Sequence, residues 1–239
     1  RKLCKNFSGL HVLQNIDLAV QAGERRAIIG PNGAGKTTLF NLISGELQPS
    51  SGQVLLEGRN VTGQTPDIMC RHGLARTFQK NNLFFQLTTH ENVRLVVQAH
   101  QGASPHWFRP WQSFSPVNDQ TRQILQRLEL WSRRDEVVKN LSYGEQRQLE
   151  VAMALAAEPK LLLLDEPTAG MSPAETAQTV DMIASLPREL TVLIIEHDMD
   201  AVFSLADRIA VLNYGQLLAD GTPDAVKADP KVQEVYLGA

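Results

Sequence analysis

The stretch GPNGAGKT at residues 30–37 decides the fold of this chain, because it matches the pattern G-x-x-x-x-G-K-[S/T] in full. A short apolar run at residues 26–29 precedes it, and residues 36–44 carry apolar side chains at helical spacing. Gly33 and Gly35 let the backbone of the loop turn tightly, so that its N–H groups converge on phosphate oxygens. The stretch therefore predicts a buried strand, a phosphate-binding loop and a helix whose N-terminus faces the same anion.

Two side chains of this loop carry the predicted chemistry. Lys36 is expected to reach the β- and γ-phosphates of ATP, and the hydroxyl of Thr37 is expected to ligate Mg²⁺. A chance glycine-rich turn is the alternative, which the full match and the strand–loop–helix context disfavour. The loop residues expected to contact ATP are Asn32, Gly33, Ala34, Gly35, Lys36, Thr37 and Thr38.

Two further aliphatic runs, at residues 161–164 and 192–195, are too short for independent helices. Unbroken runs of this length are typical of parallel strands that helices cover on both faces. Charged residues follow each run, Asp165-Glu166 after the first and residues 196–198 after the second. Because open α/β sheets bind their ligands at the carboxyl ends of the strands, we expect these groups at one site.

The two acids at the end of the first run suggest a division of labour. Asp165 can hold Mg²⁺ through a bound water, and Glu166 can polarise the attacking water. Paired acids after a strand are otherwise often a solvated strand end. The phosphate-binding loop elsewhere in the chain favours the catalytic interpretation.

Composition limits the classes of protein that fit. The 239 residues suffice for one large domain, and a formal net charge of −3 lacks the basic excess of a nucleic-acid binder. Cys4 and Cys70 lie in no metal-binding pattern and make a disulfide framework unexpected. No apolar stretch reaches the length of a membrane span, so we expect a cytosolic protein that can dock on a membrane protein.

The middle of the chain is expected to be helical. Residues 87–100 and 118–130 read as helices, and the stretch 102–117 between them as a loop rich in proline and aromatic residues. A strand is expected at residues 53–57. The fold prediction is α/β, with a mostly parallel sheet flanked by helices and a helical insertion over residues 80–157.

The segment LSYGEQ at residues 141–146 resembles the signature motif of ATP-binding cassette (ABC) ATPases, usually LSGGQ. Tyr143 and Glu145 depart from the common form. The other motifs of that family follow in its order: Gln79 resembles the Q-loop glutamine, 161–166 the Walker B motif, 169–173 the D-loop and His197 the switch histidine. Gly170 to Pro173 lacks the usual Leu-Asp of the D-loop.

The resemblance implies the fold of that family across residues 1–239. This is one domain with a P-loop NTPase core (1–79 and 158–239), an antiparallel β subdomain and a helical subdomain (80–157). It also implies that Phe7 stacks on the adenine of ATP. The implied catalytic residues are Glu166 as general base, His197 at the γ-phosphate, Gln79 and Lys36, and the implied Mg²⁺ ligands are Thr37, Gln79 and Asp165.

The signature also implies a partner. A helix predicted over residues 143–156 would present its N-terminal N–H groups to an anion, which in this family is the γ-phosphate on the opposite subunit. An ordinary N-cap by Ser142 is the alternative and is compatible with that role. Two ABC ATPase subunits, a homodimer or paralogues, would then enclose two ATP molecules. The residues implied to act across that interface are Ser142, Tyr143, Gly144 and Glu145.

Four stretches resemble one subfamily, the ATP-binding subunits of importers for branched-chain and related hydrophobic amino acids. They are GLARTFQ at 73–79, LSYGEQRQLE at 141–150, residues 169–173 and YLGA at 236–239. The resemblance implies transmembrane permease subunits, an extracytoplasmic solute-binding protein and a peripheral position on the cytoplasmic face of the cell membrane. Import of urea or amides, lipopolysaccharide export, a soluble non-transport ABC ATPase and a non-hydrolysing regulatory cassette are the alternatives.

Overall fold

The computed structural model describes residues 1–77, 82–102 and 115–237. Its centre is a six-stranded sheet in the order β10-β9-β3-β8-β7-β6. The strands β6, β7, β8, β3 and β9 run parallel, and β10 is antiparallel to β9. Their bounds are β3 (Arg25–Ile29), β6 (Leu74–Arg76), β7 (Leu161–Asp165), β8 (Thr191–Ile195), β9 (Arg208–Asn213) and β10 (Gln216–Gly221). The α/β prediction is confirmed.

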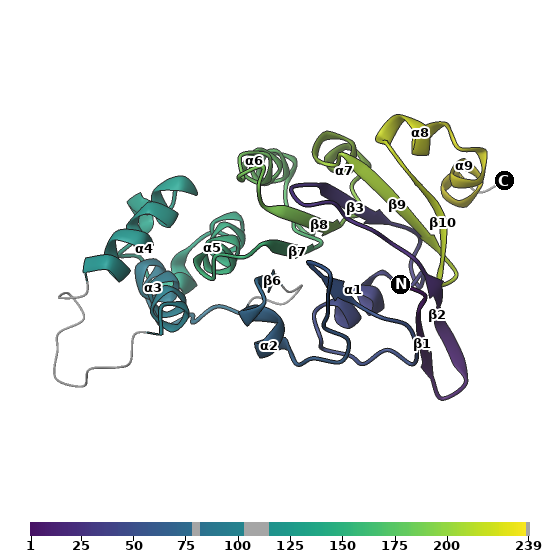
Figure 1. The fold of residues 1–239 in the computed structure, drawn as a ribbon. Helices are drawn as coiled ribbons and strands as arrows, with labels where there is room; N and C mark the ends of the chain where they lie inside the picture. Colours follow the sequence, from purple (N-terminus) through teal and green to yellow (C-terminus); the bar gives the residue numbers. More distant parts are fainter. Residues whose placement is uncertain (78–81, 103–114, 238–239) are drawn as a thin grey trace.

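Helices cover both faces of the sheet (Figure 1). On one face, Leu163 packs in a core cluster with Leu39 and Phe40 of α1 (Lys36–Ile43). On the other face, Leu162 and Leu164 pack against the helices α5 (Tyr143–Ala156) and α6 (Pro173–Ala184). Because successive strand residues point to opposite faces, both sets must be apolar, which explains the unbroken aliphatic runs.

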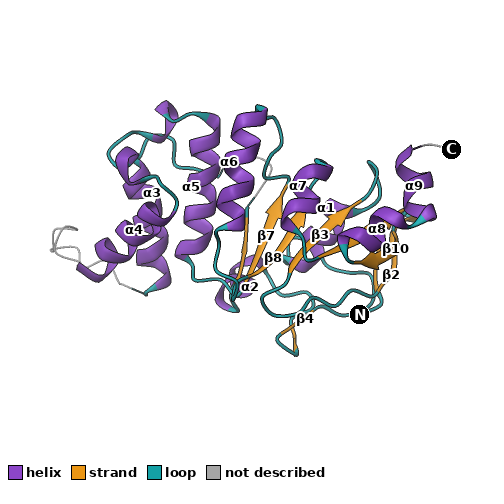
Figure 2. Cartoon of the chain, turned by 90° about the horizontal axis from the view of Figure 1, so that it is seen from above, coloured by secondary structure: helices purple, strands orange, loops and turns teal. Residues whose placement is uncertain are grey.

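The remaining helices of the core follow the strands in sequence. They are α2 (Pro66–Arg71), α6 (Pro173–Ala184), α7 (Met199–Leu205), α8 (Pro223–Ala228) and α9 (Pro230–Leu237). Figure 2 shows α6 beside α5 at the edge of the sheet, with α8 and α9 near the C-terminus.

Two short antiparallel hairpins lie outside the main sheet. One joins β1 (Leu3–Phe7) to β2 (Leu10–Ile16), and the other joins β4 (Leu55–Leu56) to β5 (Arg59–Asn60). The strand expected over residues 53–57 is thus shorter than predicted. Glu57 adopts a left-handed φ of 50° and Gly58 one of 78°, so the chain already turns there.

Three helices form a helical unit beside the sheet: α3 (Thr89–His100), α4 (Ser115–Arg127) and α5 (Tyr143–Ala156). They agree with the helices predicted at 87–100 and 143–156, whereas α4 begins and ends three residues before the predicted 118–130. The loop predicted at 102–117 is therefore wrong at residues 115–117, which lie in α4, and its residues 103–114 lie outside the described residues. Short 3₁₀ turns at Trp131–Arg133 and Val138–Asn140 lead into α5. A single core cluster joins this unit to the sheet, with Val93, Leu125 and Leu149 continuing into Leu162. No helix in the described ranges is both long and apolar enough to span a membrane.

Leu163 lies at the centre of this packing and is fully buried. Replacing it with alanine (Leu163→Ala) should lower the free energy of unfolding by about 2–5 kcal/mol, because the cavity would open between β7 and α1. Urea unfolding measures the change. The matched control is Leu10→Ala on β2, whose side chain is 67% exposed and whose effect should stay within about 0.5 kcal/mol. Equal effects of the two changes would contradict the predicted central position of β7.

Candidate functional site

The candidate site lies at the carboxyl ends of three neighbouring strands. Ile195, the last residue of β8, is in register with Ile28 of β3 on one side and with Asp165 of β7 on the other. The loop 30–37 follows β3, and the groups 165–166 and 196–197 end β7 and β8. The topology therefore brings together segments that are more than a hundred residues apart in sequence.

The loop 30–37 is shaped by its glycines. Gly35, the N-cap of α1, has a φ of 102°, and a Cβ on it would lie 2.7 Å from Leu13 Cδ2. Gly33 has a φ of 81°, yet a Cβ there would meet nothing within 4 Å. Both glycines thus adopt a left-handed φ that disfavours a side chain, and Gly33 also has open space around it. This open space at the N-terminus of α1 fits the phosphates of a nucleotide.

Lys36 is buried with 7% of its surface exposed, and it points back across the loop. Its Nζ donates to the carbonyl oxygens of Gly30 (2.6 Å) and Pro31 (3.1 Å). Burial lowers the pKa of the ammonium, and the carboxylates of Glu166 and Asp165 act in the opposite direction. The cation is therefore held inside the loop and within the field of both predicted acids.

Glu166 and His197 are brought into direct contact. The His197 ring nitrogen Nε2 lies 2.7 Å from Glu166 Oε1, and both side chains keep some exposure to solvent. The backbone N–H of Glu166 donates to the carbonyl oxygen of Ile195 at 2.9 Å. Its φ of 50° is unusual for a residue with a side chain, and such strain persists where the surroundings impose it.

Asp165 presents two different oxygens. The carboxylate is almost fully buried, and its Oδ2 is paired with Arg76 Nη2 at 2.8 Å. Its Oδ1 is buried without a hydrogen-bond partner among the described residues. An ionised oxygen that lacks a partner is costly to bury, so a cation or its water at this point fits the donor set.

Glu196 is a site residue to which the sequence analysis assigned no role. It is 3% exposed, and its carboxylate accepts from the backbone N–H groups of Thr168 (3.0 Å) and His197 (2.7 Å). The Thr168 hydroxyl donates to the same carboxylate. Glu196 thereby ties the loop after Glu166 to the residue that precedes α7. Its position directly before His197 was the available signal.

The signature residues form the N-terminus of α5. Ser142 is its N-cap, as expected, and makes a reciprocal capping box with Glu145. Glu145 is also paired with Arg133 at 2.9 Å, and the Tyr143 hydroxyl donates to Ala169 O at 3.3 Å. Within the described part of the chain, none of their hydrogen bonds reaches the loop 30–37.

The structure places Phe7, which is predicted to stack on adenine, but does not describe Gln79. Phe7 ends β1 with 41% of its surface exposed, and Lys5 Nζ lies 4.8 Å from its ring centroid. The Phe7 ring is therefore on the surface, where a ligand can stack on it, and does not belong to the core. Gln79 lies outside the described residues, and the described chain stops before it at Thr77, one residue after β6.

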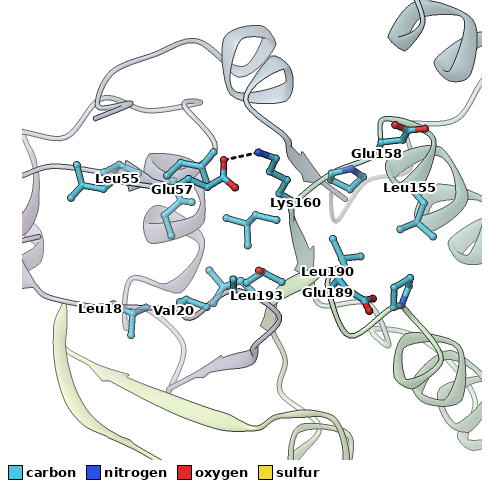
Figure 3. Close-up of a pocket in the computed structure, with 18 of the residues that line it drawn as sticks. Leu18, Val20, Leu55, Glu57, Leu155, Glu158, Lys160, Glu189, Leu190 and Leu193 are labelled. Carbon is cyan, nitrogen blue, oxygen red and sulfur yellow. Dashed lines mark hydrogen bonds and ion pairs between the residues drawn. The ribbon is translucent and has the colours of Figure 1, made fainter. Parts of the chain in front are cut away.

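A cavity of about 1090 Å³ lies at the opposite edge of the sheet (Figure 3). It opens at the amino ends of β7 and β8, and aliphatic side chains such as Leu55, Leu190 and Leu193 line it. The pair Glu57–Lys160 (2.7 Å) crosses its rim. Asp165 and His197 lie at the other ends of these strands, so this cavity is separate from the candidate site.

Comparison with known proteins identifies the family. A family model described as ABC transporter matches residues 13–169, and one described as branched-chain amino acid ATP-binding cassette transporter matches residues 216–239. The chain therefore belongs to the ABC transporter ATPases, which bind and hydrolyse ATP.

Individual relatives agree with that family over nearly the full chain. The high-affinity branched-chain amino acid transport ATP-binding protein LivG of Escherichia coli (strain K12) is 39% identical over 245 residues, covering 99% of this chain and 95% of LivG. The corresponding protein BraF of Pseudomonas aeruginosa is 37% identical over the same length, with the same coverage. A crystal structure of the ADP conformation of an ATP-binding cassette from an ABC transporter matches with a TM-score of 0.85 and 30% identity. The match covers 100% of this chain and 97% of the chain in that crystal structure.

Glu196→Ala should destabilise the protein by about 1–3 kcal/mol or more, because it leaves the buried donors of Thr168 and His197 without an acceptor. Chemical unfolding measures the loss. Glu57→Gln is the control, since its ion pair with Lys160 is about 60% exposed and worth at most about 1 kcal/mol. If both variants lose a similarly small amount of unfolding free energy, Glu196 does not hold the segments of Thr168 and His197 together.

Proposed function

We propose that this chain is the nucleotide-binding subunit of a transporter that imports branched-chain or related hydrophobic amino acids. The observation that carries the ATPase half of the proposal is the convergence of loop 30–37, Asp165 and the pair Glu166–His197 at one sheet edge. The match of residues 216–239 to the branched-chain amino acid cassette model supports the solute class. In this proposal, residues 1–239 form one ATPase domain with residues 80–157 as its helical subdomain.

The residues would divide the work as follows. The N–H groups of loop 30–37 and the ammonium of Lys36 bind the phosphates, and Phe7 stacks on the adenine. Glu166 accepts the proton of the attacking water, and His197, hydrogen-bonded to it, orients that carboxylate and contacts the γ-phosphate. Mg²⁺ would neutralise phosphate charge while held by Thr37, Gln79 and, through water, Asp165.

The second half of the ATP site would come from a second ABC ATPase subunit. Ser142 and Gly144 lie at the N-terminus of α5, where N–H groups and the helix dipole favour an anion. Their hydrogen bonds stay away from the loop 30–37 of the same chain. Closure of two subunits head to tail would bring the γ-phosphate bound by one subunit to this helix end of the other, with Tyr143 and Glu145 flanking it.

The alternatives differ in what they would couple to ATP. LivG and BraF are both named for branched-chain amino acid transport, which favours that solute over urea, amides or lipopolysaccharide. A soluble non-transport ATPase would need no permease. In the proposed role the subunit is peripheral to the cytoplasmic face of the membrane, with permease subunits and an extracytoplasmic binding protein completing the transporter.

Transport itself tests the solute. The chain, co-expressed with its permease subunits and placed in proteoliposomes, should show ATPase activity that a leucine-loaded binding protein stimulates. Lipopolysaccharide and urea serve as the competing stimuli. If lipopolysaccharide or urea stimulates the ATPase activity and the amino-acid-loaded protein does not, the proposed solute is wrong.

Glu166→Gln should retain ATP binding while lowering turnover by roughly 10²- to 10⁴-fold, because the amide cannot accept the proton of the attacking water. Steady-state phosphate release measures the rate, and size-exclusion chromatography in ATP should reveal an accumulated dimer. Glu189→Gln, an exposed acid outside the site, is the matched control. Normal turnover in Glu166→Gln would assign the base elsewhere.

Lys36→Ala should weaken ATP binding by roughly 10- to 150-fold, the equivalent of one hydrogen bond to a charged group. A fluorescent-nucleotide titration measures the affinity. Lys160→Ala, at the opposite end of the sheet and 61% exposed, should bind ATP like the parent. Unchanged ATP affinity in Lys36→Ala would contradict the proposal that loop 30–37 binds the phosphates of ATP.

A further inference from the structure

Arg76 is the last residue of β6 and points its guanidinium into the protein. Its side chain is 7% exposed, and the Asp165 carboxylate with which it pairs is 2% exposed. Such a pair costs desolvation on both sides, so it is weak evidence for a contribution to stability alone. The role of the Arg76–Asp165 pair is therefore inferred from its geometry.

Among the described residues, the guanidinium forms a three-way junction with the side chains of Asp165, Asn41 and Ser44. Nη2 donates to Asp165 Oδ2 (2.8 Å), while Nη1 donates to Asn41 Oδ1 (2.7 Å) and to Ser44 Oγ (2.9 Å). Asn41 lies in α1 and Ser44 is the C-cap of that helix. A planar guanidinium fixes the directions of its donors, so Arg76 sets the distance between the end of β7 and α1.

These two elements carry the two described residues that are proposed to hold Mg²⁺. Thr37 is in the first turn of α1, and Asp165 ends β7. Arg76 occupies Asp165 Oδ2 and leaves Oδ1 buried without a hydrogen-bond partner among the described residues. Arg76 therefore selects the oxygen that remains for the cation.

We propose that Arg76 is a positioning residue for the Mg²⁺ of the ATP site, which fixes the Asp165 carboxylate and its spacing from Thr37. This inference rests on the proposed function and names a residue of that same site. Partners that orient a ligating carboxylate act in this way in metal sites, and their loss costs roughly 10- to 100-fold in metal affinity.

The test compares nucleotide affinity with and without the metal. The purified chain is titrated with a non-hydrolysable ATP analogue in excess Mg²⁺ and again in EDTA. The dissociation constant in EDTA divided by that in Mg²⁺ reports the metal's contribution to binding. Arg76→Lys keeps the positive charge but cannot form the three-way junction. It should reduce the ratio by roughly 10- to 100-fold, with the affinity in EDTA unchanged.

The control is Arg71→Gln on α2, whose ion pair with Asp67 is exposed. It should leave the ratio unchanged. A purely structural role of Arg76 would lower thermal stability and leave the ratio intact, and that result overturns the inference. If Arg76→Lys does not fold, the double variant Asn41→Ala with Ser44→Ala decides, because it releases the junction from α1 and keeps the Arg76–Asp165 pair. A reduced ratio there supports the inference, and an unchanged ratio overturns it.

The two proposals fail in different ways. If the parent chain binds the analogue under neither condition, the proposed function fails. If the parent shows the Mg²⁺-dependent gain and Arg76→Lys shows the same gain, only the role of Arg76 fails.

Discussion

The site depends on one constraint, which is that the central strands are buried on both faces. Leu162 and Leu164 face the helical unit, while Leu163 faces α1, so no position within β7 can carry a polar group at low cost. Polar chemistry is thereby confined to the strand ends. Parallel direction then places these ends together, and residues as distant as Gly30, Asp165 and His197 meet at one edge.

Charge balance at this edge explains why a nucleotide and a divalent cation fit together. The buried or half-buried cations are Lys36 and Arg76, and the facing carboxylates are those of Asp165, Glu166 and Glu196. Glu196 accepts hydrogen bonds from the backbone of Thr168 and His197, and Asp165 Oδ2 is paired with the cationic Arg76. Asp165 Oδ1 has no hydrogen-bond partner among the described residues, and the Glu166 carboxylate contacts His197. In the proposed function, a divalent cation between these carboxylates and a bound polyphosphate would reduce the repulsion between like charges.

Contiguous patterns in the sequence predicted most of this arrangement. The loop 30–37 and the aliphatic runs carry their structural signal locally, since a glycine pattern or an apolar period needs no distant partner. Because Glu166 and His197 each follow the end of a buried strand, the sequence predicted that they would lie at one site. Atomic contacts such as the 2.7 Å bond between them required the structure.

Other features could not be predicted because their cause is long-range. Arg76 belongs to a three-residue strand with no apolar period, and its partners Asn41 and Asp165 come from elements far along the chain. Burial makes Glu196 a structural anchor, whereas its sequence position suggests only another charge at a strand end. The strand expected at 53–57 is shorter than predicted for the opposite reason: a local turn at Glu57 ends it at Leu56.

Ser142 shows how one N-cap residue can be held from two directions. Its Oγ accepts from the backbone N–H of Glu145, and its side chain also bonds to the Glu145 carboxylate. The Glu145 carboxylate turns back to the N–H of Ser142 and is also paired with Arg133. Burial raises the pKa of Glu145, but the bonds from Ser142 and Arg133 outweigh it and hold the pKa below its usual value. This reciprocal capping satisfies donors at the start of α5 within one chain, and in the proposed function a phosphate from a second subunit would have to compete with these internal bonds.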